Sequence, residues 1–409
     1  MLMPRRRIVI LTEDSKPALG GIAEYLHQLA RALSGTHDVL IVSSIPGADL
    51  VAGGPHVRYR EMRWFRSHRR MRGDGFMPMR RLNTLVWRLV GRRHMRTTLA
   101  AIAADPADTT YVIGRMSVVT HPWCVACREL DLPYVAFGYG LELIDTVPPA
   151  AVRQREVDVR AARHWFPISD DTMRLLDAFG VPRRSQTLLQ PGVDPASVAA
   201  PDARRREARE RLGLGRSRFL LTVCHLRARK GVDLSIRAFA AIADEFPDVR
   251  YVVAGVGPEY DALTALAAEC GLGGRVVFAG RVDDGLRNAL LAECDAFVMT
   301  NLRLPRDVEG FGIVFLEAAL HGKATIGGRN GGVPDAVVDG VTGLLADTDD
   351  GPDDAARAMR QLLGDPEAAA RMGACGRARA LREFSWPARA ETFARTIDGL
   401  AAIPATIRP

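Results

Sequence analysis

Lysine is nearly absent from this chain of 409 residues. Of its 55 lysine and arginine residues, only Lys16, Lys230 and Lys323 are lysines. Arginine takes the place of lysine almost everywhere and alanine is abundant, which is the bias of a GC-rich coding sequence. The net charge of +7 therefore gives little support to nucleic-acid recognition.

Long apolar runs are also missing. No stretch approaches the roughly 20 apolar residues that a membrane-spanning helix needs. The basic start of the chain is followed by only four apolar residues, 8–11, which lead directly into Thr12-Glu13-Asp14. We interpret this run as a first buried strand rather than a signal peptide, and we expect a cytoplasmic protein.

The cysteines show no framework spacing; they stand at positions 124, 127, 224, 270, 294 and 375. Cys124 and Cys127 form a lone Cys-x-x-Cys with His121 just upstream. A zinc site would need a second pair, and a redox site would need a thioredoxin-like context. We therefore expect reduced thiols on helices.

A metal site is not expected elsewhere either. The one Asp-x-Asp is Asp347-Thr348-Asp349, in an acidic turn after a predicted strand. A metal-dependent transferase would place such a pair beside a diphosphate, but here we expect it to cap the next helix. The sequence predicts no metal and no cofactor.

Short β-branched runs alternate with helical patterns along the whole chain, which is typical of βα units around parallel sheets. A length of 409 residues favours two domains. Strands are predicted at 7–12, 38–43, 57–62, 110–114, 133–138 and 164–168, and then at 218–224, 249–255, 275–280, 296–300, 324–328 and 343–346. The predicted fold class is α/β, with two Rossmann-like doubly wound domains facing across an interdomain cleft.

The domain limits follow from composition. Residues 1–194 form the predicted first domain, and the polar, arginine-rich segment 195–217 the predicted linker. Residues 218–385 form the predicted second domain. Residues 386–409 begin with Trp386-Pro387 and are helical in pattern, and we expect this helix to return to the first domain.

The stretch "VEGFGIVFLEA" contains two carboxylates around an apolar run, Glu309 and Glu317. A carboxylate near a packed core is costly unless something pairs with it. Gly310 and Gly312 predict that Glu309 lies on a loop and that Glu317 lies in the second turn of the helix that follows. The amides of the first turn can bind a diphosphate, and a carboxylate such as Glu317 can accept hydrogen bonds from vicinal hydroxyls.

At this point the sequence resembles the retaining GT-B glycosyltransferases of family 4. The resemblance lies in "EGFGIVFLEA" and "GGRNGGVPDAVVDGVTGLL", in "RKGVDLSIRAF", "VVAGVGPEYDAL" and "VVFAGRVDD", and, in the first half, in "GGIAEYLHQLARAL" and "QPGVD". These motifs span nearly the whole chain in the order of that family. By contrast, Gly255-Val256-Gly257 alone would not make a dinucleotide fingerprint.

The resemblance implies a role for each matching residue. Glu317 would hold the ribose, Glu309 the hydroxyls of the donor sugar, and Lys230 the diphosphate as it leaves. The backbone near Arg281 and Val282 would read the base. The expected donor site comprises Gly20, Gly21, His225, Arg229, Lys230, Arg281, Val282, Glu309, Gly310, Phe311, Gly312 and Glu317, with Glu309 and Lys230 as its catalytic residues; Asp14 and Tyr139 are expected on the acceptor side.

Two positions depart from the pattern of the family. His225 stands where a phosphate-binding arginine is usual; Arg227 or Arg229 could replace that arginine, or His225 could act when protonated. His225 could equally be a strand-end residue satisfied by backbone. Tyr139 stands where a histidine often contacts the sugar, which leaves that contact open.

The function that this resemblance implies is sugar transfer, with retention, from a nucleotide-diphosphate sugar to a hydroxyl group of a small-molecule, natural-product, glycan or lipid-linked acceptor. UDP and GDP sugars both fit, and we expect UDP. A sugar-nucleotide epimerase of the same architecture is the alternative, and an arginine-rich nucleic-acid binder is a third reading. Few lysines and many phosphate-turn glycines favour the enzymes.

Residues 58–96 contain thirteen arginines and only two acidic residues, Glu61 and Asp74. This segment is either a solvated surface loop or an attraction site for an anionic acceptor or an anionic membrane surface. If the second reading holds, neutralising Arg66, Arg69, Arg70 and Arg72 should weaken acceptor or vesicle binding and leave nucleotide affinity intact.

Overall fold

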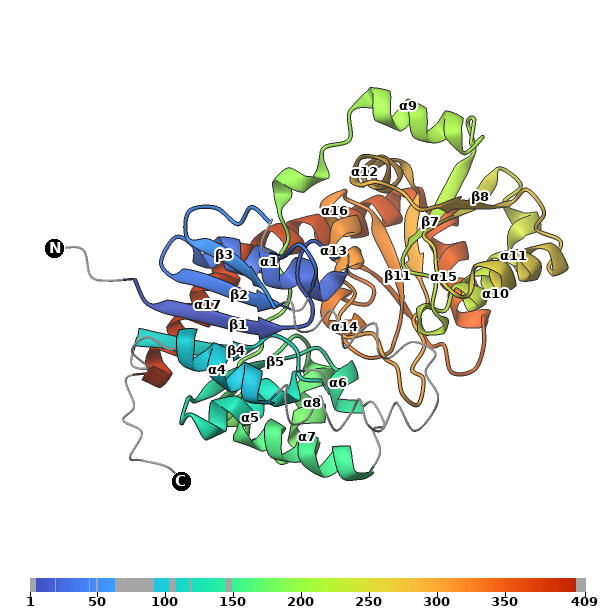
Figure 1. Cartoon of the computed structure of the whole chain (residues 1–409). Helices are drawn as coiled ribbons and strands as arrows, with labels where there is room; N and C mark the ends of the chain where they lie inside the picture. Colours follow the sequence, from blue (N-terminus) through green and yellow to red (C-terminus); the bar gives the residue numbers. More distant parts are fainter. Residues whose placement is uncertain are drawn as a thin grey trace. The chain divides into compact units, whose positions relative to one another are not determined.

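The computed structural model describes residues 5–18, 20–43, 45–48, 51–62, 92–102, 108–117, 120–144 and 149–401. The chain divides into two compact units. Unit 1 comprises Met1–Gly192 and Trp386–Pro409, and unit 2 comprises Val193–Ser385. Each unit is a parallel sheet with helices packed against it (Figure 1).

Unit 1 contains a six-stranded sheet in the order β3-β2-β1-β4-β5-β6. The centre of the sheet is apolar, and Ile8, Val9, Ile10 and Leu11 are fully buried, as expected for a parallel strand covered on both faces. Strand order reverses between β1 and β4, so the ends of these two strands form the switch point where doubly wound sheets bind ligands. The strands are β1 (Arg7–Thr12), β2 (Asp38–Ser43), β3 (Val57–Glu61), β4 (Thr109–Ile113), β5 (Tyr134–Gly138) and β6 (His164–Pro167).

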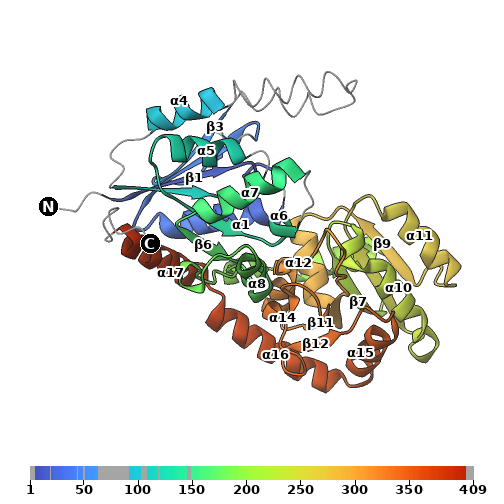
Figure 2. The same ribbon diagram turned by 90° about the horizontal axis from the view of Figure 1, so that it is seen from below.

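The helices of unit 1 come from both ends of the chain. They are α1 (Gly21–Leu33), α4 (Arg92–Ile102), α5 (His121–Glu129), α6 (Leu141–Ile144), α7 (Pro149–Ala161), α8 (Asp170–Ala178) and α17 (Trp386–Ala401). Helix α17 lies against α1 (Figure 2). Phe393 of α17 is fully buried, with ring centroids 5.6 Å from Phe137 and 4.6 Å from Phe166. Aromatic packing therefore makes α17 part of the core of unit 1.

Unit 2 repeats the same topology, with the sheet order β12-β11-β10-β7-β8-β9. Its switch point lies between β7 and β10. The strands are β7 (Arg218–Val223), β8 (Val249–Ala254), β9 (Val276–Gly280), β10 (Ala296–Met299), β11 (Ala324–Gly328) and β12 (Gly343–Ala346). The helices are α9 (Asp202–Arg211), α10 (Val232–Ala240), α11 (Tyr260–Glu269), α12 (Asp284–Glu293), α13 (Ile313–Leu320), α14 (Val333–Ala336), α15 (Asp353–Gly364) and α16 (Pro366–Glu383).

The two parallel sheets confirm the predicted α/β fold class, and each predicted strand coincides with an observed strand to within two residues at either end. The segment 195–217 contains helix α9, which packs on α12 within unit 2 and is fixed there by an ion pair of 2.7 Å between Arg209 Nε and Glu293 Oε2. Helix α10 ends at Ala240, and a 3₁₀ turn follows at Ala243–Glu245.

The arginine-rich segment 58–96 lies largely outside the described residues, and so do the four arginines whose neutralisation tests it. In the parts of the chain that the structure describes, every helix is too short or too polar to traverse a bilayer.

Replacing Phe393 with alanine should destabilise unit 1 by about 3–5 kcal/mol, because it empties the aromatic cluster between α17 and the sheet. Urea unfolding followed by circular dichroism measures this loss, with the transitions of the two units fitted separately. The exposed Glu391→Ala on the same helix is the matched control and should change stability by less than about 0.5 kcal/mol. Equal behaviour of the two variants would show that α17 contributes little to the core.

Candidate functional site

The residues that the sequence marks for donor binding in unit 2 gather at its switch point. Lys230 lies in the connection that follows β7, and Glu309 in the connection that follows β10. The carboxyl ends of neighbouring parallel strands open at the same edge of a sheet, which explains how positions 79 residues apart come into contact.

Gly231 fixes the connection after β7. Its φ of 63° lies in the left-handed region, and a Cβ atom there would stand 2.0 Å from the carbonyl oxygen of Thr300. Glycine is therefore required both by conformation and by close approach. The residue ends a 3₁₀ turn at Ala228–Lys230 and begins α10, which presents Lys230 toward the loop after β10.

Glu309 is the buried acid of this site, with 8% of the residue exposed. Its Oε2 atom pairs with Lys230 Nζ, accepts a hydrogen bond of 3.1 Å from Asn301 Nδ2 and lies 3.9 Å from Arg229 Nε. Burial alone would raise the pKa of Glu309, but the charges of Lys230 and Arg229 outweigh it and hold the pKa below the ordinary value. Glu309 is therefore an ionised hydrogen-bond acceptor at neutral pH.

Arg229 pairs mainly with a second acid, Asp307. Its NH1 atom lies 3.0 Å and 3.2 Å from the two carboxylate oxygens of Asp307. The charge of Arg229 is thus largely neutralised within the protein, whereas Lys230 shares one carboxylate with other donors. Of the two predicted phosphate-binding residues, Lys230 is the better placed to meet an incoming anion.

A glycine turn holds the backbone of Glu309 in place. Gly332 N–H donates to the carbonyl of Glu309 at 2.9 Å. Gly331 has φ of 56°, and a Cβ atom there would stand 2.3 Å from that same carbonyl oxygen. The "GGRNGG" stretch therefore holds the backbone of Glu309 in position by close packing.

Helix α13 begins immediately after the "EGFG" stretch. Gly312 precedes it with φ of 84°, and no side chain caps the helix. The N–H of Phe315 donates to the carbonyl of Gly312 at 3.0 Å, whereas the amides of Ile313 and Val314 have no acceptor among the described residues. Phe311 is buried, with its ring centroid 5.9 Å from that of Phe384. Glu317 lies in the second turn, half-buried, 3.8 Å from Arg287 NH2 of α12. Glu309 on a loop and Glu317 on the helix are both as predicted.

The remaining predicted donor contacts lie at the surface of unit 2. His225 and Arg227 follow β7, and their exposed side chains make no hydrogen bond with any described residue, so the strand-end reading of His225 as satisfied by backbone is wrong. Arg281 is exposed and Val282 half-buried, directly after β9. These positions stay predictions, because no bound nucleotide tests them.

Two other motifs have structural roles. A Cβ atom at Gly255 would stand 1.8 Å from the carbonyl oxygen of Cys224, and one at Gly257 would stand 2.2 Å from that of Leu226, so both glycines allow the connections after β7 and β8 to pack together. The expectation that the Asp-x-Asp pair caps α15 is wrong. No side chain caps that helix, and the backbone N–H of Asp347 instead donates to Asp354 Oδ2 at 2.7 Å.

The described residues contain no group of three or more His, Cys, Asp or Glu side chains that could hold a metal ion. Cys124 and Cys127 are free and buried in α5, and burial raises the pKa of the Cys127 thiol to about 12. These two cysteines are the reduced helix thiols that the sequence predicts.

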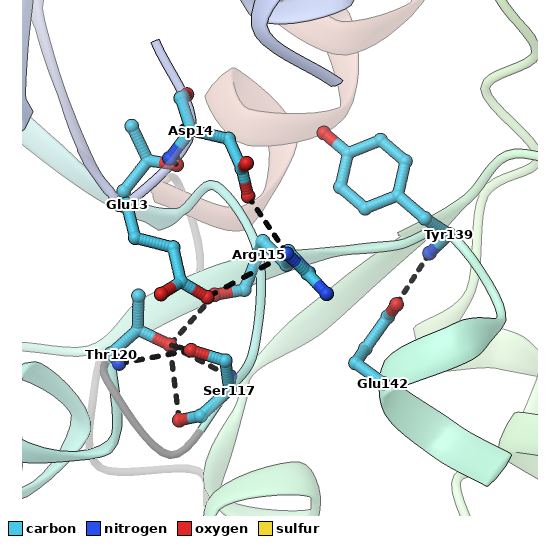
Figure 3. A network of polar contacts seen from close by, with 8 residues as sticks. Glu13, Asp14, Arg115, Ser117, Thr120, Tyr139 and Glu142 are labelled. Carbon is cyan, nitrogen blue, oxygen red and sulfur yellow. Dashed lines mark hydrogen bonds and ion pairs between the residues drawn. The ribbon is translucent and has the colours of Figure 1, made fainter. Parts of the chain in front are cut away.

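Unit 1 carries the predicted acceptor-side residues at its own switch point (Figure 3). Asp14 follows β1 and lies 3.1 Å from NH1 of Arg115, which follows β4. Tyr139 follows β5, and its backbone N–H donates to Glu142 Oε1 at 2.5 Å. Neither Arg115 nor Glu142 is predicted from the sequence. Arg115 is recognised only by its contact with Asp14, 101 positions away, and Glu142 only by its hydrogen bond with the backbone of Tyr139.

We call Asp14, Arg115, Tyr139 and Glu142 the acidic cluster. Three of its polar atoms are buried without a partner among the described residues: Arg115 Nε, the Tyr139 hydroxyl and Glu142 Oε2. Burial raises the pKa of Glu142. The hydrogen bond from the Tyr139 N–H and the charge of Arg115 lower it by less, so the pKa stays above its ordinary value. Gly20, before α1, has φ of 154° and open space where a Cβ would stand, and Gly20 and Gly21 are both exposed. Unit 1 thus offers hydroxyl-binding groups and, before α1, an exposed glycine pair.

Replacing Lys230 with methionine should destabilise unit 2 by about 3 kcal/mol at pH 7, because Glu309 keeps its charge and loses its main partner. In the wild type the pKa of Glu309 is lowered, so the pair stabilises the fold above the ordinary value of 4.5 and that stabilisation is lost as the pH falls through the lowered pKa. As the pH falls from 7, the unpaired Glu309 carboxyl of the variant takes up a proton, and its burial then costs less. The difference in stability should therefore shrink between pH 7 and pH 4.

Urea unfolding over this pH range measures the effect. Lys323→Met removes a lysine that makes no ion pair with a described residue and should cost little at any pH. A loss at Lys230 that does not change with pH would contradict the assigned pairing.

Comparison with known proteins agrees with this geometry. Residues 204–379 match the family model described as glycosyl transferases group 1. The chain is 31% identical over 399 residues to a GDP-mannose-dependent alpha-(1-6)-phosphatidylinositol monomannoside mannosyltransferase of Mycolicibacterium smegmatis, covering 96% of this chain and 98% of the relative. The enzyme of the same description from Mycobacterium tuberculosis is 29% identical, with the same two coverages.

Among solved structures, Anabaena HepE in complex with UDP and glucose superposes with a TM-score of 0.74 at 19% identity, covering 97% of this chain and 100% of that chain. At this identity the likeness shows the fold, which is GT-B. The match at 31% identity over nearly the whole length shows the family. The chain belongs to the glycosyl transferases group 1, as the sequence motifs indicated.

Proposed function

We propose that this glycosyltransferase moves mannose from GDP-mannose to a hydroxyl group of a lipid-linked glycan acceptor, with retention at the anomeric carbon. The observation that carries the proposal is the likeness, over 96% of the chain, to relatives that use GDP-mannose. It replaces the expectation of UDP, which rests on the frequency of UDP sugars in the family and not on the motifs, since these fit UDP and GDP sugars alike. That the enzyme uses a nucleotide sugar follows from the family; mannose, GDP and the acceptor are proposed.

The Glu309–Lys230 pair supplies the chemistry of the proposed reaction. An ionised, buried carboxylate can accept hydrogen bonds from two hydroxyl groups of the donor sugar and hold the ring in one orientation. As the bond from the anomeric carbon to the diphosphate breaks, negative charge grows on the leaving phosphate oxygen. Lys230 stabilises that charge more in the transition state than in the ground state, which is what lowers the barrier.

The diphosphate needs more cationic partners than Lys230 alone. Arg229 is held by Asp307, whereas His225 and Arg227 are exposed and unpaired among the described residues. We assign the second phosphate contact to one of these two, with the amides of Ile313 and Val314 in the first turn of α13 as further donors. The phosphate-binding arginine usual at position 225 is then replaced by a neighbour rather than lost.

The nucleoside is assigned to Glu317 and to the backbone after β9. Glu317 offers a half-buried carboxylate to the two ribose hydroxyls, with Arg287 nearby to orient it. Residues 281 and 282 would bind the base through backbone groups, which is compatible with guanine. No metal ion has a role in this scheme, since cationic side chains and helix amides meet the phosphate charge.

The acceptor is assigned to unit 1. Within the acidic cluster, Asp14, Tyr139 and Glu142 offer acceptors for hydroxyl hydrogens, as a sugar or cyclitol ring requires. The mycobacterial relatives act on phosphatidylinositol monomannoside, and we propose a glycolipid of that kind here. Such an acceptor would bring the enzyme to a membrane surface as a peripheral protein.

Incubation with GDP-mannose and vesicles containing phosphatidylinositol mannosides should give a mannosylated lipid with an α linkage, read from the anomeric coupling of the product by NMR. UDP-glucose and UDP-galactose are the donor controls and should give less than a tenth of the product. Isomerised donor formed without acceptor would favour the epimerase reading instead. Transfer from a UDP sugar alone would contradict the proposed donor while leaving the family intact.

Removing the Glu317 carboxylate with Glu317→Ala should weaken GDP binding by about 10- to 100-fold, corresponding to the loss of one or two charge-assisted hydrogen bonds. Isothermal titration with GDP measures this directly and needs no acceptor. The exposed Glu210→Ala in α9 is the matched control and should leave the affinity unchanged. Wild-type affinity in Glu317→Ala would remove the ribose from this residue.

A further inference from the structure

The second residue after the end of β10, Asn301, has no role in the scheme above. Asn301 lies at the switch point of unit 2, across from the connection that carries Lys230, and it is fully buried. A buried asparagine has four hydrogen-bonding positions to satisfy in its side chain, so its presence at the edge of a site needs a physical reason.

The backbone of Asn301 is held from three directions. Its N–H donates to Met299 O at 2.9 Å, and its carbonyl accepts from Asn330 Nδ2 at 3.2 Å and from Thr348 Oγ1 at 3.1 Å. A Cβ atom at Gly328 would stand 2.1 Å from that carbonyl, so β11 packs directly against it. The side chain of Asn301 therefore starts from a backbone that has little freedom to move.

The carboxamide points to Glu309. Asn301 Nδ2 donates to Glu309 Oε2 at 3.1 Å, the same oxygen that Lys230 contacts. Because an ionised carboxylate only accepts hydrogen bonds, the amide nitrogen must face it, and Asn301 Oδ1 then remains without a partner among the described residues. The cost of that buried oxygen is tolerated for the sake of the contact with Glu309.

Lys230 cannot hold Glu309 in the same way throughout the reaction. In the proposed function its ammonium group must also meet the donor diphosphate, whose charge competes with the carboxylate. Asn301 is neutral, so an arriving phosphate attracts it far less, and its restrained backbone keeps the amide on Glu309. Lys230 and Asn301 thus behave differently when the nucleotide sugar binds: Lys230 is drawn to the diphosphate, and Asn301 stays on Glu309.

We propose that Asn301 is a positioning residue that holds the Glu309 carboxylate oriented and ionised while Lys230 turns to the diphosphate. The inference rests on the proposed function for the sugar hydroxyls that Glu309 accepts. Asn301 itself touches neither the nucleotide nor the phosphates. Its removal should consequently change turnover and the pH profile, and leave nucleotide affinity alone.

The charged groups around Glu309 set the direction of the pH effect. Lys230 and Arg229 face it from the connection after β7 and stabilise the anion, Asp307 is paired with Arg229, and Cys224 lies in the same field. Asn301→Ala removes a neutral donor to the anion, and Asn301→Asp adds a second negative charge. Both variants should raise the pKa of Glu309, in the order aspartate above alanine above wild type.

The experiment is a pH titration of the Glu309 carboxyl carbon by NMR in the full chain labelled with ¹³C-glutamate, assigned with Glu309→Gln. We expect the midpoint to rise by about one unit in Asn301→Asp and by less in Asn301→Ala. The acidic limb of kcat/KM for GDP-mannose should move to higher pH by the same amount, so that activity in Asn301→Asp is up to about tenfold lower than wild type near pH 4 and recovers by pH 8. GDP affinity should stay within twofold of the wild type.

Ser235→Ala is the matched control. Ser235 is fully buried and hydrogen-bonded to Thr300, the residue before Asn301, at 2.9 Å, but it does not contact Glu309. It should lower stability and leave both titrations unchanged. An unchanged Glu309 midpoint in both Asn301 variants would overturn the inference.

The NMR arm separates this failure from failure of the proposed function. If the wild type transfers no mannose, the kinetic arm is silent, but the carboxyl midpoint still reports whether Asn301 stabilises the Glu309 anion. If mannose is transferred and the midpoint does not move, the function stands and Asn301 is a core residue only. If Asn301→Asp does not fold, Asn301→Ala supplies the same comparison.

Discussion

The structure of unit 2 depends on keeping one buried carboxylate charged. Glu309 is 8% exposed, and an isolated anion at that depth would take up a proton instead of remaining ionised. The charges of Lys230 and Arg229 outweigh the loss of water, and Asn301 adds a hydrogen bond to the carboxylate. The glycines at 231, 328 and 331 are required by the close backbone packing that brings these groups to it. The glycine-rich motifs and the acid are therefore one feature: the turns have no room for side chains because the loops converge on the carboxylate.

The same sheet order in both units gives each a switch point, but the two differ in charge. In unit 2 the ends of β7 and β10 bring together Lys230, Arg229, His225 and Arg227 against two acids, Asp307 and Glu309. In unit 1 the ends of β1, β4 and β5 bring together three acids against one cation; they are Glu13, Asp14, Glu142 and Arg115. A phosphate-bearing donor suits the first surface and a hydroxyl-bearing acceptor the second, which is the division of labour proposed for this enzyme.

Much of this could be predicted from the sequence because the signals are local. Alternating β-branched and helical patterns gave both sheets, and two glycines around Phe311 gave the loop position of Glu309 and the helical position of Glu317. The pairings could not be predicted. Arg229 with Asp307 and Arg115 with Asp14 are fixed by strand order, which brings together residues that are 78 and 101 positions apart. Asn301 with Glu309, 8 positions apart, is fixed by the path of the connection after β10. The expectation that the Asp347–Asp349 pair caps α15 is wrong because the sequence does not show that the Asp354 carboxylate accepts from the backbone N–H of Asp347.

The Lys230–Glu309 pair has a further consequence for catalysis. Because the two charges are already buried side by side in the folded protein, the cost of removing them from water is incurred on folding and not when the donor binds. The dipoles that the transition state needs are then in place before the substrate arrives, which is the condition for electrostatic stabilisation without reorganisation. A surface lysine and a surface glutamate would each have to lose water and side-chain freedom during binding. In the proposed reaction, only the turn of Lys230 from Glu309 to the diphosphate would then remain to be made when the donor binds.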